Sequence, residues 1–86
     1  MDSIIPYDNS KTPAQWVDEV YNALLSHRGT GVMEVEVPGG RVGVKNNYFS
    51  REFYYEGVDE HGNPVSIRDS SWKSIKDILY TLWMNC

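Results

Sequence analysis

His27, His61 and Cys86 are the residues from which a nucleophilic catalytic set would be built, since the chain has two histidines and one cysteine. The sequence pattern places His27 at the end of a helix and His61 in a hairpin turn, so two distant loops would have to converge. A histidine that compensates the helix dipole and a histidine in a turn account for both positions without chemistry. We therefore expect that the chain is not an enzyme.

The sequence supports a metal site or a phosphate-binding site no better than it supports a nucleophilic catalytic set. Asp59, Glu60 and Asn63 carry oxygen ligands, but their spacing does not follow the EF-hand pattern, and hairpin turns collect the same residue types. The pair Gly39-Gly40 joins two strands and precedes no Lys-Ser or Lys-Thr, unlike a phosphate-binding loop. A single cysteine excludes an intramolecular disulfide and a cluster of thiol ligands. We expect no metal and no cofactor.

A segment with the character of a binding site follows the first of two predicted hairpins. It spans Lys45–Arg51 and holds the adjacent aromatics Tyr48 and Phe49 between two cations, with no acid. Aromatic residues and arginine dominate protein interfaces, and aromatics flanked by cations also stack on unpaired bases. In the alternative interpretation Tyr48 or Phe49 covers the edge of the core, and the small size of the domain slightly favours it. Tyr54 and Arg68 are expected to extend the same surface.

Acidic residues gather in the first part of the chain. Residues 1–36 contain two cations and six acids, which accounts for the net charge of −4, whereas residues 37–86 contain six of each. Four of these six acids form a second candidate surface, composed of Asp18, Glu19, Glu34 and Glu36. Such a surface imitates the phosphates of a nucleic acid and fits the basic groove of a nucleic-acid enzyme. A solvated charged face explains the same residues.

The first element that positions these residues is a helix over about residues 13–28. Thr12–Gln15 reads Thr-Pro-Ala-Gln, which combines a capping box with a proline in the first turn. Apolar residues then recur at helical spacing, and Gly29 is suited to end the helix.

Beyond Gly31 the period changes to two, which predicts an antiparallel hairpin with one apolar and one charged face. With the turn centred on Gly39-Gly40, two valine pairs face the core and one charged pair faces solvent. These pairs are Val37 with Val42, Val35 with Val44, and Glu34 with Lys45. The outer face then carries four charged side chains where the acidic and basic sides meet: Glu34, Glu36, Arg41 and Lys45.

A second hairpin is predicted around Asp59–Gly62, which fits a type I turn followed by a left-handed glycine. Its register pairs Tyr55 with Ile67 on the inner face and Tyr54 with Arg68 on the outer face. Pro64 cannot donate to the ladder, so the last strand begins at an edge or with an unpaired position.

The last predicted element is a helix capped by Ser70 or Ser71, with an apolar stripe between Trp72 and Trp83. The order is therefore α-β-β-β-β-α, an α+β fold in which both helices pack on one face of an antiparallel sheet. We expect residues 1–11 to be a tail and residues 12–86 to be a single domain. Double-stranded RNA-binding domains also combine a helix, antiparallel strands and a final helix. Their final helix begins with a glycine and a run of lysines that bind phosphate, and the last helix predicted here lacks both.

Composition and termini indicate where such a chain would act. Hydrophobic residues make up 41% and charged residues 23%, which is a globular balance. The chain has neither a signal-peptide pattern at its start nor an apolar run long enough for a membrane span, so a cytoplasmic location without membrane contact is expected. The net charge of −4 argues against non-specific binding to nucleic acid.

Three functional hypotheses follow from these observations. The first is a small interaction protein that binds and inhibits or adapts another protein, of the type of phage anti-defence inhibitors and immunity proteins, with a nucleic-acid enzyme as one target of the acidic face. The second is a single-stranded nucleic-acid-binding module that uses the aromatic and basic residues. The third is a self-associating domain, a monomer or weak homodimer, in which Tyr80, Met84 and Cys86 form the contact. The candidate partner-binding residues are Glu34, Glu36, Arg41, Lys45, Tyr48, Phe49, Arg51, Tyr54 and Arg68.

Overall fold

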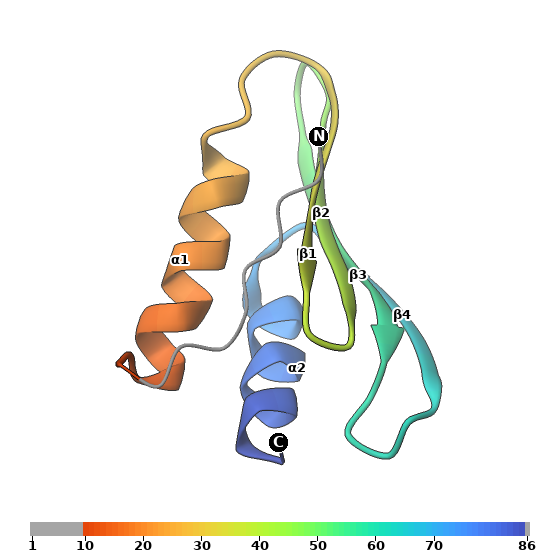
Figure 1. The fold of residues 1–86 in the computed structure, drawn as a ribbon. Coiled ribbons are helices and arrows are strands. Elements are labelled where there is room, and N and C mark those ends of the chain that lie inside the picture. Colours follow the sequence, from red (N-terminus) through yellow and green to blue (C-terminus); the bar gives the residue numbers. More distant parts are fainter. Residues whose placement is uncertain (1–9, 86) are drawn as a thin grey trace.

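The fold is a helix, four strands and a second helix in chain order (Figure 1). A computed structural model describes residues 10–85. Its elements are α1 (Pro13–Leu25), β1 (Gly31–Val37), β2 (Gly40–Asn46), β3 (Arg51–Val58), β4 (Pro64–Asp69) and α2 (Lys73–Met84). The strands form one antiparallel sheet in the order β1-β2-β3-β4, which confirms the predicted fold class and element order. Of the expected tail, residues 1–9 lie outside the described residues, and Lys11 pairs with Glu19 on α1.

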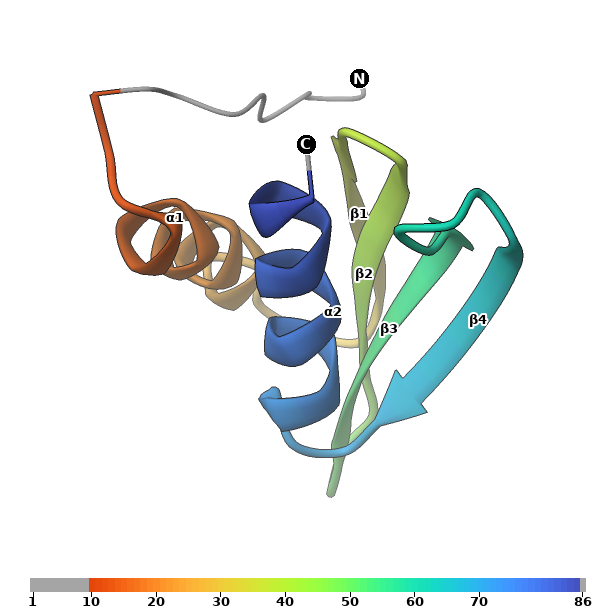
Figure 2. The same ribbon diagram turned by 90° about the horizontal axis from the view of Figure 1, so that it is seen from below.

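Both helices cover the same face of the sheet, as Figure 2 shows. α1 packs beside β1, whereas α2 packs on β3 and β4 and also contacts α1. The two helices meet through Trp16 and Trp83, whose rings are edge to face with centroids 5.4 Å apart. The core lies between the helices and the sheet and is composed of Trp16, Val17, Val20, Leu24, Val35, Val37, Val42, Val44, Phe53, Tyr55, Ile75, Leu79 and Leu82. Neither helix is long and apolar enough to cross a membrane, within residues 10–85.

The register predicted for the first hairpin was wrong by two positions. Val35 pairs with Val42, and Val37 pairs with Gly40, so Pro38 and Gly39 form a two-residue turn. The reason is the turn itself, because Gly39 adopts a φ of +98° directly after a proline, the combination that a type II turn requires. A slip of two residues leaves every side chain on its predicted face.

The same correction changes the charged pairs. Glu34 lies opposite Gly43 rather than Lys45, and Glu36 lies opposite Arg41. All four charged residues predicted on the outer face are therefore on that face, with other neighbours than expected.

The second hairpin has the register that the sequence predicted. Tyr55 pairs with Ile67, and Tyr54 pairs with Arg68. The backbone N–H of Asp59 donates to the Asn63 carbonyl at 2.9 Å, and Gly62 has a φ of +80°, as expected for a type I turn followed by a left-handed glycine.

Helix α1 begins as predicted but ends earlier. The capping box between Thr12 and Gln15 is present in both directions, with bond lengths of 2.9 and 3.2 Å. The helix ends at Leu25 instead of residue 28, because the Ser26 hydroxyl donates to the Ala23 carbonyl at 2.6 Å. A side chain that binds a carbonyl of the preceding turn competes with continuation of the helix. Residues 27–30 therefore belong to the α1–β1 loop.

The cap of α2 also differs from the prediction. The Asp69 carboxylate accepts hydrogen bonds from the backbone N–H groups of Ser71 at 3.0 Å and Ser74 at 3.1 Å. Lys73 N–H lies 3.5 Å from the Ser71 hydroxyl, at the limit of a hydrogen bond. The hydrogen bonds to Asp69, first the one from the Ser71 backbone, lower the pKa of its carboxyl from the ordinary 3.8 to about 2. The last residue of β4, rather than either serine, is the main cap of α2.

Candidate functional site

The structure divides the predicted contact residues between two surfaces. Most of them lie on the outer face of the sheet, which neither α1 nor α2 covers: Glu34, Glu36, Arg41, Lys45, Tyr54 and Arg68. The others, Tyr48, Phe49 and Arg51, line a cleft at one end of the sheet. Tyr54 and Arg68 do not line that cleft. They line a separate hollow on the outer face together with Lys45, the first residue of the Lys45–Arg51 segment, so the structure brings the expected surface together only in part.

Tyr54 organises the outer face. Its ring lies over Gly43 on the neighbouring strand, and a Cβ at Gly43 would lie only 2.2 Å from Tyr54 Cζ. The Tyr54 hydroxyl reaches across β2 and donates to the Glu34 carboxylate on β1. Burial, and then the bond to Glu34, raises the pKa of Tyr54 above its usual 10.0. The glycine thus makes room for a polar contact that spans three strands.

The charges around Tyr54 are largely paired with one another. Arg41 Nε lies 3.7 Å from Glu34 Oε2, and Arg41 Nη2 lies 3.4 Å from Glu56 Oε1. Exposed pairs of this kind stabilise a fold little, but they leave less unpaired charge for a partner.

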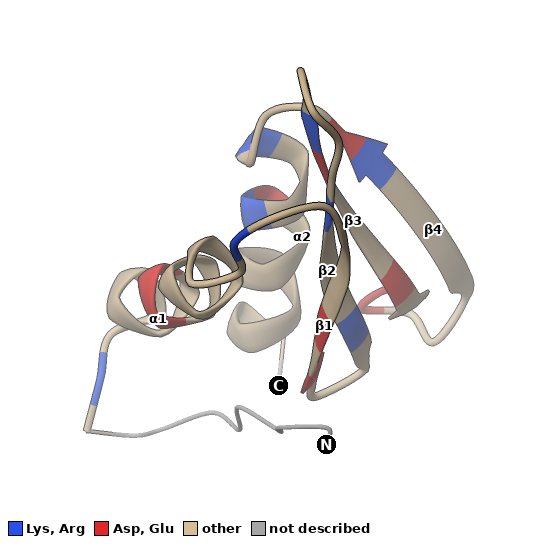
Figure 3. Cartoon of the chain, turned by 90° about the horizontal axis from the view of Figure 1, so that it is seen from above, with Lys and Arg blue, Asp and Glu red and all other residues tan. Residues whose placement is uncertain are grey.

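The four acids predicted as one surface lie on two layers. Glu34 and Glu36 are on the outer sheet face, whereas Asp18 and Glu19 are exposed on α1, on the other side of the core. Figure 3 shows the acidic positions of α1 and those of β1 on different parts of the molecule. These four side chains therefore do not form a continuous acidic face.

The cleft, which we call the loop cleft, lies between the α1–β1 loop and the β2–β3 loop. Figure 1 shows both loops at one end of the molecule, opposite the two hairpin turns. The cleft is open to solvent and has a volume of about 840 Å³. Its lining residues are Leu25, His27, Arg28, Gly29, Thr30, Asn46, Asn47, Tyr48, Phe49, Ser50 and Arg51.

Tyr48 and Phe49 form the exposed tip of the β2–β3 loop. Asn47 N–H donates to the Ser50 carbonyl at 2.8 Å and closes the loop beneath them. The relative exposure is 90% for Tyr48 and 101% for Phe49, and their ring centroids are 6.3 Å apart. The interpretation that one of them covers the core edge is therefore wrong.

Other aromatic residues complete the core instead. Tyr21, Phe53 and Trp72 form a cluster in which neighbouring ring centroids are 5.0, 5.2 and 5.6 Å apart. The structure thus fills its interior without Tyr48 and Phe49, and both remain in solvent.

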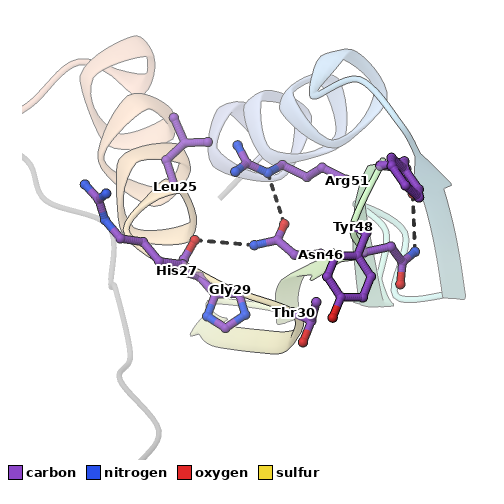
Figure 4. A pocket seen from close by; sticks show the side chains of 11 residues that line it. Leu25, His27, Gly29, Thr30, Asn46, Tyr48 and Arg51 are labelled. Atoms are coloured by element: carbon purple, nitrogen blue, oxygen red, sulfur yellow. Dashed lines mark hydrogen bonds between the residues drawn. The ribbon is translucent and has the colours of Figure 1, made fainter.

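A buried amide connects the two sides of the loop cleft (Figure 4). Asn46 is only 8% exposed, and its Nδ2 donates to the His27 carbonyl at 3.3 Å. Its Oδ1 accepts a hydrogen bond from Arg51 Nε at 3.1 Å. One side chain therefore links the α1–β1 loop to the first residue of β3 and orients the Arg51 guanidinium.

The loop cleft is locally cationic although the chain is acidic. Its lining contains Arg28 and Arg51 but no Asp or Glu, and neither arginine has an acidic partner among residues 10–85. The Nε2 atom of His27 is buried at the same place and has no hydrogen-bond partner among the described residues.

Sequence reasoning missed His27, Arg28 and Asn46 as site residues. The two basic residues were assigned to the end of α1, and they enter the cleft because the helix ends earlier, at Leu25. The sequence around Asn46 contains no signal for its role, because its partners come from the end of α1 and the start of β3.

The remaining candidates for chemistry are dispersed. His27 lies in the α1–β1 loop and His61 in the β3–β4 turn, at opposite ends of the fold (Figure 1). Within residues 10–85, no three His, Cys, Asp or Glu side chains are placed to hold a metal ion. At the end of α2, Met84 is 73% exposed and Tyr80 is partly buried against the core, whereas Cys86 lies outside the described residues.

Comparison with known proteins found no matching family model, no similar curated protein and no similar solved structure.

Proposed function

We propose that this chain is a non-enzymatic binding protein that attaches to a protein partner through the loop cleft. The observation that carries the proposal is the full exposure of Tyr48 and Phe49, two large adjacent aromatics at the tip of a closed loop. Tyrosine, tryptophan and arginine are the residue types most enriched among interface hot spots. The loop cleft joins an exposed tyrosine, a phenylalanine and two arginines.

The energetics favour a role in association rather than in folding. Burying a side chain the size of Phe49 stabilises a protein by about 1.5–3 kcal/mol. Tyr48 and Phe49 stay exposed when residues 10–85 fold, so they do not contribute this stabilisation to the fold. A partner that covers both aromatics gains this burial free energy on binding. The loop that presents them is closed by a backbone hydrogen bond, so less conformational freedom is lost on binding.

Binding of this kind changes a partner by occlusion or recruitment. A chain of 86 residues that covers a functional surface of another protein acts as an inhibitor or an adaptor. This is the type of action found in phage anti-defence inhibitors and immunity proteins. The separation of Asp18 and Glu19 from Glu34 and Glu36 gives no support to a nucleic-acid-mimicking face.

The proposal is tested by affinity capture from a lysate of the source organism, with three forms of the chain as bait. Wild type is compared with Tyr48→Ser/Phe49→Ser and with Met84→Ser, which also removes an exposed apolar side chain but at the other end of the molecule. We expect one stoichiometric partner that is retained by wild type and Met84→Ser and lost by the double variant. Equal retention by all three baits, with unchanged thermal unfolding, would contradict the proposal.

Single-stranded nucleic acid is the second candidate ligand, and the observation that favours it is the acid-free lining of the loop cleft. Bases would stack on Tyr48 and Phe49 while Arg28 and Arg51 contact phosphates. Two phosphate contacts predict a salt slope, log K against log salt, of about −1.4. The measurement is fluorescence anisotropy of labelled oligonucleotides at several salt concentrations. Absence of binding at low salt removes this candidate.

A further inference from the structure

The inference rests on the proposed function, in which a protein partner binds at the loop cleft. The charge around the cleft then indicates the chemical class of the partner segment that binds there. The chain carries eight cations and twelve acids, so the molecule as a whole is negative. The cleft lining has the opposite charge, with two arginines and no acid among its described residues. An interface that complements this lining presents negative charge to the cleft, and it must do so over a short distance.

The distance matters because of screening. Charges are screened over about 8 Å at physiological ionic strength, whereas the molecule measures 37 × 27 × 24 Å. A ligand confined to the cleft lies nearest to Arg28 and Arg51. A long polyanion that continues past the cleft meets the acids of the sheet, beginning with Glu52 directly after Arg51. The arrangement favours a short acidic element over an extended strand of nucleic acid.

The orientation of Arg51 favours a carboxylate. Its Nε donates a hydrogen bond to Asn46 Oδ1 at 3.1 Å, which restrains the guanidinium. The terminal nitrogens have no acidic partner among residues 10–85. A guanidinium held in this way binds a carboxylate through parallel hydrogen bonds, with less loss of side-chain freedom than a mobile lysine would incur.

We propose that the partner element in the loop cleft is an acidic peptide segment of a protein, with a carboxylate on Arg51 and an adjacent apolar side chain on Tyr48 and Phe49. The carboxylate provides the charge that the cleft lacks, and the apolar neighbour covers the two exposed rings. Arg28 lies on the opposite loop and adds to the positive charge of the cleft lining.

The test is selection from a displayed library of random peptides with the wild-type chain as bait. We expect the selected peptides to combine Asp or Glu with a large apolar residue. Each of the substitutions Arg51→Gln and Tyr48→Ser should weaken their binding at least about tenfold. Arg68→Gln serves as the matched control and should not change it, because it removes an exposed outer-face arginine that has no salt-bridge partner among residues 10–85. Arg51→Lys should restore only part of the affinity, because it keeps the charge but loses the fork of donors.

The outcomes separate this inference from the proposed function. Peptides that depend on Tyr48 but not on Arg51, or that are neutral or basic, overturn the acidic segment and leave the aromatic contact standing. If the wild-type bait enriches no peptide more strongly than the Tyr48→Ser bait does, the inference is also overturned. The proposed function is tested separately, by capture of the partner. Binding of single-stranded oligonucleotides tighter than that of any selected peptide would assign the cleft to nucleic acid instead.

Discussion

Replacement of Asn46 by alanine tests the geometry of the loop cleft without touching its exposed surface. Asn46 is 8% exposed and makes hydrogen bonds of 3.3 Å to the His27 carbonyl and 3.1 Å from Arg51 Nε. A hydrogen bond of this kind contributes about 0.5–1.5 kcal/mol, and more when one partner is charged. Asn46→Ala should therefore lower the free energy of unfolding by about 2 kcal/mol.

The matched control is the neighbouring Asn47→Ala. Asn47 is exposed, and its side chain makes one hydrogen bond, 3.3 Å to the Ser50 hydroxyl, whereas its backbone closes the loop. Removing that side chain should cost no more than about 0.5 kcal/mol. Because 1 kcal/mol shifts the midpoint of a domain this size by about 4–8 °C, Asn46→Ala should lower Tm by roughly 8–16 °C and Asn47→Ala by a few degrees at most.

Urea unfolding followed by circular dichroism gives both free energies, and an unchanged m value shows that the comparison is valid. A double-mutant cycle of Asn46→Ala with Arg51→Ala then isolates the bond between the two side chains, with an expected coupling of at least about 0.5 kcal/mol. Equal destabilisation by Asn46→Ala and Asn47→Ala, together with no coupling to Arg51, would refute the view that Asn46 joins the two loops.

Two other features of the fold give separate predictions. Asp69 has a pKa of about 2 in the folded chain against 3.8 ordinarily, so its stabilising effect is complete above pH 3.8 and is lost as the pH falls through about 2. Asp69→Asn should therefore lose less Tm than wild type when the pH falls from 3.8 to about 2. Identical pH profiles of Tm for the two proteins would contradict the role of the Asp69 carboxylate as the cap of α2. Gly43→Ala should displace the Tyr54 ring and return its raised pKa toward 10.0, as followed by ultraviolet titration with Tyr54→Phe as the reference. A Tyr54 titration unchanged by Gly43→Ala would show that the ring does not depend on the glycine.

Much of the fold was predictable because local and periodic signals agree in this chain. The capping box at Thr12, the turn at Asp59–Gly62 and the alternation of valines with charges each specify an element and its buried face. The first register failed because Pro38-Gly39 and Gly39-Gly40 are both plausible turn centres, and only the backbone decides between them. Periodicity of two does not distinguish registers that differ by two residues.

The loop cleft was less predictable because it depends on contacts between distant segments. The sequence singled out Tyr48 and Phe49, but their exposure followed from the aromatic cluster that fills the core without them. The partners of Asn46 lie 19 residues before it and 5 residues after it. No local pattern marks an asparagine that will bridge two loops, and the early end of α1 that brings His27 there was itself mispredicted.

NMR chemical-shift mapping shows residue by residue whether the partner binds at the loop cleft. The isotopically labelled chain is titrated with the protein recovered by capture, and backbone amide shifts are followed residue by residue. We expect the largest changes in residues 27–30 and 46–51, with the outer-face residues Glu34 and Arg41 nearly unchanged. Largest changes at Glu34, Glu36 and Arg41, with residues 46–51 unmoved, would contradict binding at the loop cleft and place the interface on the outer face of the sheet.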